Sequence, residues 1–427
     1  MVAQSDRNQQ WKRAAGISTR VLLWGLAALL SHAVGARAAT TKHATRKTSH
    51  GPVVRTGLDE LETQKFAPLR GKHVGLITNH TGLDAQGRST VDVLFHAPGV
   101  QLVALFSPEH GLAGRNDEKI NSSTDAATGL TIYSLYGETL RPTDDMLQGV
   151  DALVFDVQDA GVRFYTYITT MAYCMEAAAR RHIAFYVLDR PNPLGGEIVE
   201  GPMLDADKTS FVGYYPLPVR YGLTIGELAQ FLNAENQIGV DLHVVAMKNW
   251  RRNYFFDSTG LRWVPPSPNL RTTKGAILYP GLEILQNAGV SVGRGTETPF
   301  EHFGAPWVKG DEVAAALNAR NVPGVRFTAQ AFVTVSGLYA GQRSGGVAIK
   351  IVDPQAVRSM RVGLEIASVL RQQYPADFDP SKLLLLLGNA EAVTALQNGT
   401  PPERIIAAWS PAVADFESKR RKYFLYK

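Results

Sequence analysis

A glutamate and a histidine, Glu109 and His110, stand side by side between Pro108 and Gly111. They follow the apolar run 100–106, which is typical of a buried β-strand. A carboxylic acid in a partly enclosed site can donate a proton to a leaving oxygen, and a neighbouring histidine can tune that acid or bind substrate. The pair is therefore the first candidate for chemistry, although His110 could also be a hydrogen-bonded structural histidine.

Short apolar runs, rich in Val, Ile, Leu and Phe, dominate the first half of the chain and lack polar alternation, as strands covered on both faces should. Between them lie helix candidates, notably 89–96 and 164–181. This alternation predicts a Rossmann-like parallel α/β sheet. The four runs cover residues 73–78, 100–106, 152–157 and 183–188.

Each run is followed by a polar loop bounded by Gly or Pro. In a parallel sheet these exits open at one edge, and open α/β sheets bind ligands outside the carboxyl ends of their strands. We therefore expect a shared site at this edge, although Asp, Asn, Gly and Pro are also ordinary turn formers. The runs and their exits supply these candidates: Asn79, His80, Glu109, His110, Asp156, Asp159, Asp189 and Arg190.

Several common kinds of site are not indicated. Residues 82–87 (GLDAQG) lack the glycine spacing and lysine of a nucleotide loop, no G-x-S-x-G elbow is present, and no cofactor is expected. A metal-dependent hydrolase that uses His80, His110, Asp156 and Asp159 stays open as an alternative. No H-x-H or H-E-x-x-H spacing supports it.

The second half of the chain has its own glycine-rich stretch, residues 290–301 (VSVGRGTETPFE). Arginine binds carboxylates through paired hydrogen bonds, so this loop, with Arg294 and Glu301, could clamp a sugar or an anion. Alternatively, Arg294 pairs with Glu297 or Glu301 in a purely structural loop. Further along, the pattern predicts a strand over 345–352, an amphipathic helix over 360–373 and a basic terminal helix over 417–427.

The N-terminus is typical of an export signal. Basic residues precede the apolar run 21–30, and residues 36–38 (ARA) offer small side chains at cleavage spacing. Only about ten uninterrupted apolar residues are present, whereas a membrane span needs roughly twenty. We expect a signal peptide over 1–38, a flexible leader over 39–55, and a secreted, periplasmic protein without membrane attachment after signal cleavage.

Charge and cysteine content narrow the range of partners. The net charge is +5, but the chain through Arg55 carries nine Lys and Arg against Asp6 alone, a surplus of eight. Without that surplus the remainder has a charge of −3, which argues against nucleic acid as a partner. The single cysteine, Cys174, lies in an apolar stretch and is expected to be a buried small hydrophobe.

The length after the leader indicates two domains. From Thr56 onward roughly 370 residues remain, which is more than one core usually holds. We expect a Rossmann-like catalytic domain over 56–275 and a smaller α+β C-terminal auxiliary domain over 276–427. The proline-rich segment 265–269 is expected to link them.

Six strings carry a resemblance to a known family. They are, in order, LITNHTG, FSPEHGL, FDVQDAGVRFYTYI, LDRPNPLGG, GRGTETPFE and GAPW. The chain from about Leu58 to Lys427 resembles the NamZ-type exo-β-N-acetylmuramidases of bacterial cell-wall recycling. The resemblance implies a glycosidase that releases terminal N-acetylmuramic acid from the non-reducing end of peptidoglycan-derived muropeptides or disaccharides. It also implies a site in the cleft between a Rossmann-like and an auxiliary domain, with Glu109 as the catalytic carboxylate.

The sequence departs from the family at two places. Residues 286–289 read QNAG where many members carry an E-G-T-N-like string, and residues 344–346 read SGG where many carry Cys-Gly-Gly. The loss of the first carboxylate keeps a third alternative open, a catalytically inactive peptidoglycan-binding protein.

Glycosidic bond cleavage needs a proton for the leaving oxygen, and Glu109 is the expected acid. A second carboxylate usually serves as nucleophile or base, but some enzymes use a substituent of the substrate instead. N-acetylmuramic acid carries an acetamido group beside the reacting carbon and a lactyl group one carbon further along the ring. Participation of such a group, oriented by Asp156 or Asp159, is therefore an alternative.

The lactyl carboxylate of such a substrate calls for a cationic partner. Arg163, Arg190 and Arg294 are candidates, while Tyr165 and Tyr167 could stack on the sugar ring or hydrogen-bond to it. If a helix begins near residue 162, Arg163 and Tyr167 share one face. The arginines that neighbour aspartates in the sequence could instead pair with those aspartates.

Overall fold

The computed structural model describes residues 53–115 and 119–427. The expected signal peptide, 1–38, and residues 39–52 of the expected leader lie outside them. In the parts of the chain that the structure describes, no helix combines the length and apolar character needed to cross a membrane.

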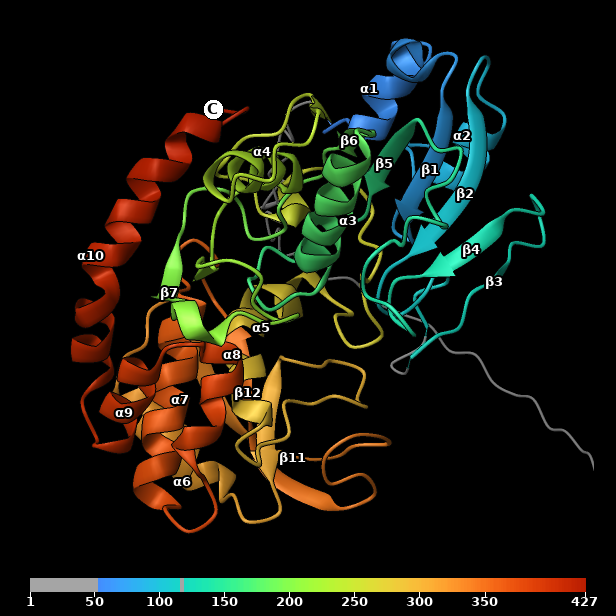
Figure 1. Cartoon of the computed structure of the whole chain (residues 1–427). Helices are drawn as coiled ribbons and strands as arrows, with labels where there is room; N and C mark the ends of the chain where they lie inside the picture. The colour runs from blue at the N-terminus through green and yellow to red at the C-terminus, as the bar shows by residue number, and fades with distance from the viewer. Residues whose placement is uncertain (1–52, 116–118) are drawn as a thin grey trace, which may run out of the picture. The chain divides into compact units, whose positions relative to one another are not determined.

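A seven-stranded sheet forms the first half of the described chain, in the order β3-β4-β2-β1-β5-β6-β9 (Figure 1). All neighbours pair in parallel except the edge strand β3. The expected α/β class and its four strands are confirmed. The strands are β1 (His73–Thr78), β2 (Gln101–Ser107), β3 (Ser123–Thr124), β4 (Thr131–Ser134), β5 (Ala152–Asp156), β6 (Ala184–Leu188) and β9 (Leu242–Val245).

The sheet is buried on both faces, which explains the continuous apolar runs. Leu153 and Phe155 of β5 belong to the larger core cluster, whereas Ala152 and Val154 belong to a second cluster on the opposite face. Helices α1 (Gly57–Thr63) and α2 (Thr90–Phe95) supply the second cluster. Helices α3 (Tyr167–Arg181) and α4 (Ile225–Glu235) supply the larger one, and Cys174 of α3 is buried there as expected.

Helix α3 begins later than the expected residue 164, and the expectation of a helix from about 162 is wrong. Residues before Tyr167 are held by backbone pairing, because Val162 bridges to Arg220 and the Arg163 N–H donates to the Val219 carbonyl at 2.8 Å. Arg220 ends β8 (Pro218–Arg220), which pairs with β7 (Glu200–Met203) in a small antiparallel sheet.

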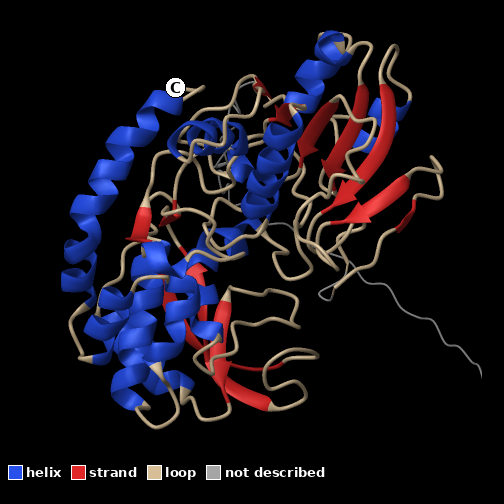
Figure 2. Cartoon of the chain, viewed as in Figure 1, coloured by secondary structure: helices blue, strands red, loops and turns tan. Residues whose placement is uncertain are grey.

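The second half of the chain combines a three-stranded antiparallel sheet, β10-β12-β11, with several helices (Figure 2). The expected strand over 345–352 and helix over 360–373 are confirmed as β12 and α7. The elements are α5 (Thr273–Gln286), β10 (His302–Ala305), α6 (Gly310–Ala319), β11 (Val325–Val333), β12 (Arg343–Ile351), α7 (Ser359–Gln373), α8 (Leu384–Leu387), α9 (Ala390–Gln397) and α10 (Pro402–Arg420).

The expected basic helix over 417–427 is wrong in its extent. Helix α10 ends at Arg420, and only a short 3₁₀ turn, Arg421–Tyr423, follows. The last residues bond elsewhere: the Leu425 N–H donates to Glu227 at 2.9 Å, and the Lys427 carbonyl accepts from the Arg252 N–H at 3.1 Å. These bonds replace the helical ladder.

The two halves share one apolar core, because the larger cluster contains both Phe155 of the parallel sheet and Leu364 of α7. The expected domain boundary at 275 lies inside α5. This helix packs closely on α7, since a methyl group added to Gly281 would lie 1.8 Å from the Ser359 carbonyl oxygen.

We therefore expect Gly281→Ala to push α5 away from α7 and to lower the free energy of unfolding by about 3 kcal/mol, the upper range for overpacking. Urea denaturation measures the effect. Lys274→Ala, at an exposed position of the same helix, serves as control and should change it by less than about 0.5 kcal/mol. Equal stability of the two variants would contradict the close packing.

Candidate functional site

A pocket of about 160 Å³ lies at the carboxyl edge of the parallel sheet, where side chains from the second half of the chain complete its wall. It brings together four residues expected from the sequence: Glu109, His110, Tyr165 and Arg294. The other lining residues are Phe164, Thr166, Val212, Ser267, Asn269, Tyr279, Glu283, Phe300 and Leu386.

Glu109 and His110 reach this pocket because the chain turns sharply after β2. His110 and Gly111 both adopt the left-handed region, with φ of 70° and 72°, so the backbone reverses within the S-P-E-H-G string. Both site side chains are half-buried. The Thr166 hydroxyl donates to a Glu109 carboxylate oxygen at 2.5 Å, which fixes the direction of the acid.

Aromatic rings form the apolar side of the pocket. The centroid of the Tyr279 ring lies 4.8 Å from that of Phe300, 5.5 Å from Phe164 and 6.0 Å from Tyr165, in edge-to-face contacts. Burial raises the pKa of both Tyr165 and Tyr279 well above the usual value. The two phenols are therefore neutral, and they offer the rigid, amphipathic surface that sugar rings contact.

Arg294 pairs with Glu283 of α5, whereas the structural alternative had named Glu297 or Glu301 as its partner. Glu297 has a side chain that is 97% exposed and lies 3.5 Å from Arg271. Glu301 accepts a hydrogen bond from the Thr272 hydroxyl at 2.6 Å and does not line the pocket. The glycine-rich loop thus directs Arg294 toward the site, whereas its glutamates lie elsewhere.

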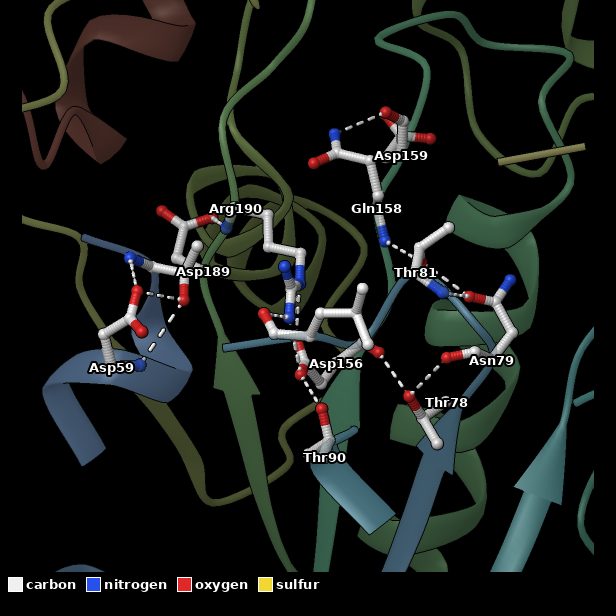
Figure 3. A network of polar contacts seen from close by, with 12 residues as sticks. Asp59, Thr78, Asn79, Thr81, Thr90, Asp156, Gln158, Asp159, Asp189 and Arg190 are labelled. Atoms are coloured by element: carbon white, nitrogen blue, oxygen red, sulfur yellow. Dashed lines mark hydrogen bonds and ion pairs between the residues drawn. The ribbon is translucent and has the colours of Figure 1, made fainter. Parts of the chain in front are cut away.

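Asp156 and Arg190 form a buried ion pair at the carboxyl edge of the sheet (Figure 3). Neither residue lines this pocket. The Arg190 guanidinium donates to both carboxylate oxygens of Asp156, at 2.5 and 2.8 Å, and the Thr90 hydroxyl donates to the same carboxylate. Arg190 also donates to the Leu83 carbonyl at 3.0 Å. These contacts favour a structural role that ties three segments together.

Asp159 and Asp189 are also buried outside the pocket. Burial raises the pKa of Asp159 to about 6, and its carboxylate accepts hydrogen bonds from the Tyr221 hydroxyl and the Gly161 N–H. Burial raises the pKa of Asp189 to about 7. Asp189 accepts hydrogen bonds from Thr224, Gly226 and Tyr426, which join α4 and the chain end to β6.

Three further predicted residues, two at the exit of β1 and one at the start of α3, do not line the pocket. Asn79 accepts from Thr81 and donates to the Tyr167 hydroxyl at 3.0 Å, and Tyr167 in turn donates to the Pro266 carbonyl at 2.6 Å. His80 hydrogen-bonds the Pro265 carbonyl at 2.8 Å, and burial lowers its pKa. These side chains hold the proline-rich segment against the sheet.

Arg163 is fully buried and is not available to a substrate anion. Its guanidinium donates to four backbone carbonyls, of Pro202, Leu217, Leu386 and Leu387, at 2.6–3.0 Å. Arg163 precedes α3, so it does not share a helix face with Tyr167. Desolvation lowers the pKa of Arg163 to about 9, which leaves it charged at neutral pH.

The residues of the metal alternative are dispersed. Over residues 53–115 and 119–427, no three His, Cys, Asp or Glu side chains form a group that could hold a metal ion. His80 bonds a carbonyl, Asp156 pairs with Arg190, and only His110 of the four lines the pocket.

Sequence reasoning missed Thr166, Tyr279, Glu283 and Phe300. Of these, Glu283 could have been predicted from the sequence, because it is the only charged residue in the apolar part of α5, residues 275–285. A lone carboxylate in an apolar helix needs a partner or a function. Gln286, one turn later, does not line the pocket.

The chain belongs to the NamZ exo-beta-N-acetylmuramidase family. The family's N-terminal model matches residues 74–274, and its C-terminal model matches residues 277–426. The chain is 43% identical over 385 residues to a peptidoglycan beta-N-acetylmuramidase NamZ of Bacillus subtilis strain 168, covering 89% of this chain and 93% of that protein.

Two solved structures from Bacteroides fragilis NCTC 9343, both described as DUF1343 family proteins, share the fold. One has a TM-score of 0.83 at 39% identity, and the other has a TM-score of 0.73 at 29% identity. Each alignment covers 88% of this chain and 99% of the solved chain.

If the Asp156–Arg190 pair is structural, Asp156→Asn should lower the free energy of unfolding by about 3–5 kcal/mol, because it leaves a buried guanidinium without its counter-charge. Urea denaturation measures this loss. Asp145→Asn, at an exposed position, should change it by less than about 0.5 kcal/mol. A stable Asp156→Asn protein would return Asp156 to the list of candidates for chemistry.

Proposed function

We propose that the protein is an exo-acting glycoside hydrolase that releases terminal N-acetylmuramic acid from the non-reducing end of peptidoglycan fragments. The observation that carries the proposal is the position of Glu109 on a half-buried pocket wall beside His110, in a chain of the NamZ family. The Bacillus subtilis relative bears the name of a peptidoglycan beta-N-acetylmuramidase, which supports the same reaction.

Glu109 serves as the general acid. Its carboxyl group donates a proton to the glycosidic oxygen as the bond to the anomeric carbon breaks, so the leaving sugar departs as an alcohol. The Thr166 hydroxyl holds one Glu109 oxygen at 2.5 Å and thereby sets the orientation of the group. Precise placement of the acid is needed because proton transfer requires hydrogen-bonding distance.

The size of the pocket supports an exo-acting enzyme. Its volume of about 160 Å³ is small, which favours a single sugar unit over several. Tyr165 and Tyr279 provide aromatic surface for that ring, and Arg294 provides the cation for a lactyl carboxylate.

Export to the periplasm completes the proposal, because peptidoglycan lies outside the cytoplasmic membrane. It is supported by the basic residues, apolar run and small residues of the segment 1–38. The substrate would accordingly be fragments formed during peptidoglycan turnover.

Glu109→Gln should reduce the release of N-acetylmuramic acid from a chromogenic N-acetylmuramide by about a thousandfold, because amide side chains cannot donate the proton. The thermal midpoint should stay nearly unchanged, since the side chain is half-buried at the pocket wall. Glu297→Gln, whose side chain is exposed, is the matched control and should retain full activity. Retained turnover by Glu109→Gln would reassign the acid.

Arg294→Ala should lower the preference for N-acetylmuramides over N-acetylglucosaminides by about tenfold or more, because a hydrogen bond to a charged group contributes about 1.5–3 kcal/mol. The ratio of the two kcat/KM values is the proper measure. The Arg294→Ala change also leaves Glu283 without its ion-pair partner. That effect lowers kcat/KM for both substrates alike, so it cancels in the ratio. An unchanged ratio would place lactyl recognition on another residue.

A further inference from the structure

Helix α5 presents two polar side chains to the pocket from the same face. Tyr279 and Glu283 are four residues apart and both line it. Glu283 is therefore the second carboxylate of the pocket that holds Glu109, whereas Asp156 and Asp159 lie outside its wall. The two carboxylates come from different halves of the chain, Glu109 from the exit of β2 and Glu283 from α5.

Glu283 is buried to an unusual degree for a carboxylate, with 8% of its surface exposed. Its Oε1 atom accepts a hydrogen bond from Arg294, but its Oε2 atom is buried and has no hydrogen-bond partner among the described residues. Such an atom costs free energy unless a donor reaches it. Because Glu283 lines the pocket, a sugar that binds there and shifts this side chain slightly can supply that donor.

We infer that the Oε2 atom of Glu283 accepts the N–H of the 2-acetamido group of the terminal sugar and directs its carbonyl oxygen at the anomeric carbon. The inference rests on the proposed function, and it assigns Glu283 the orienting role for which Asp156 and Asp159 were candidates. An amide suits this place, because its N–H can bind a fixed carboxylate while its oxygen stays free to react. Arg294 holds the other carboxylate oxygen and so fixes which one faces the substrate.

The chemistry balances in two steps. First, the acetamido oxygen forms a bond to the anomeric carbon while the glycosidic bond breaks; the leaving oxygen takes that electron pair and the Glu109 proton. Glu283 offsets the positive charge that develops on the cyclic oxazolinium. Second, water attacks the anomeric carbon and gives a proton back to Glu109, and the ring-opening electron pair restores the amide. The β configuration is retained.

Burial raises the pKa of Glu283, and the Arg294 charge acts in the opposite direction. The ion pair with Arg294 is thus the feature that favours the anionic form that an amide N–H prefers. Tyr279, one turn earlier, experiences the charges of both Glu283 and Glu109, which places all three groups in one electrostatic environment.

Three measurements on the full chain test the inference. Proton NMR of the first-formed product from a β-N-acetylmuramide should show the β anomer, and an α anomer would overturn the inference. Replacing the N-acetyl group by N-trifluoroacetyl should lower the wild-type kcat/KM more than tenfold, because fluorine weakens the attacking oxygen; no dependence would overturn it. Both use the unaltered protein and need no variant to fold.

The third measurement compares Glu283→Gln with the exposed control Glu297→Gln. Glu283→Gln should lower kcat about a hundredfold with little change in KM, and should weaken binding of a thiazoline analogue of the cyclic intermediate more than tenfold. The control should match the wild type in both. A purely structural residue would not selectively weaken the thiazoline, so unchanged thiazoline affinity in the Glu283→Gln protein would overturn the inference.

The outcomes for the two proposals are separable. A wild-type protein that releases no N-acetylmuramic acid would refute the proposed function itself. A wild-type protein that is active and depends on Glu109, but is insensitive to Glu283→Gln and to N-acyl fluorination, would refute only the role of Glu283.

Discussion

The buried guanidinium of Arg163 is the interaction on which the geometry of the pocket depends. It binds the Pro202 and Leu217 carbonyls of the first half and the Leu386 and Leu387 carbonyls of the second. Leu386 lines the pocket, and so do the three residues that directly follow Arg163. One desolvated cation thus holds wall segments from distant parts of the chain at fixed spacing, and the carbonyls compensate for its lost hydration.

The strands of the parallel sheet could be predicted because burial on both faces leaves a simple trace, an apolar run without alternation. The site could be predicted only in part. Glu109, His110, Tyr165 and Arg294 line the pocket, but a sequence does not show which polar residue at a strand exit faces solvent and which is already paired. Asp156 and Arg190 look like catalytic candidates in isolation, yet each is the partner of the other.

Glu283 was not predicted as a site residue, because it does not lie at a strand exit. It is embedded in an apolar helix far from the strand exits, and only the packing of α5 against the first half brings it to the pocket. The start of α3 could not be predicted from the sequence either. Backbone pairing of residues 162 and 163 with β8 overrides the local helical pattern there. Position 286 carries glutamine in this chain, and the carboxylate at 283 gives the pocket an acidic group one helical turn earlier.

Thr166 is the N-cap residue of helix α3, and threonine ordinarily caps a helix with its own hydroxyl. Here that hydroxyl is directed outward to Glu109, and the helix start lacks a side-chain cap. A good cap contributes about 1 kcal/mol, so the fold forgoes local stability at the residue that orients Glu109. The backbone of Thr166 is helical, with φ of −65° and ψ of −16°, so the conformation that turns its hydroxyl to Glu109 leaves the helix start uncapped. A search for more thermostable variants would be expected to meet this conflict first at the entrance to α3.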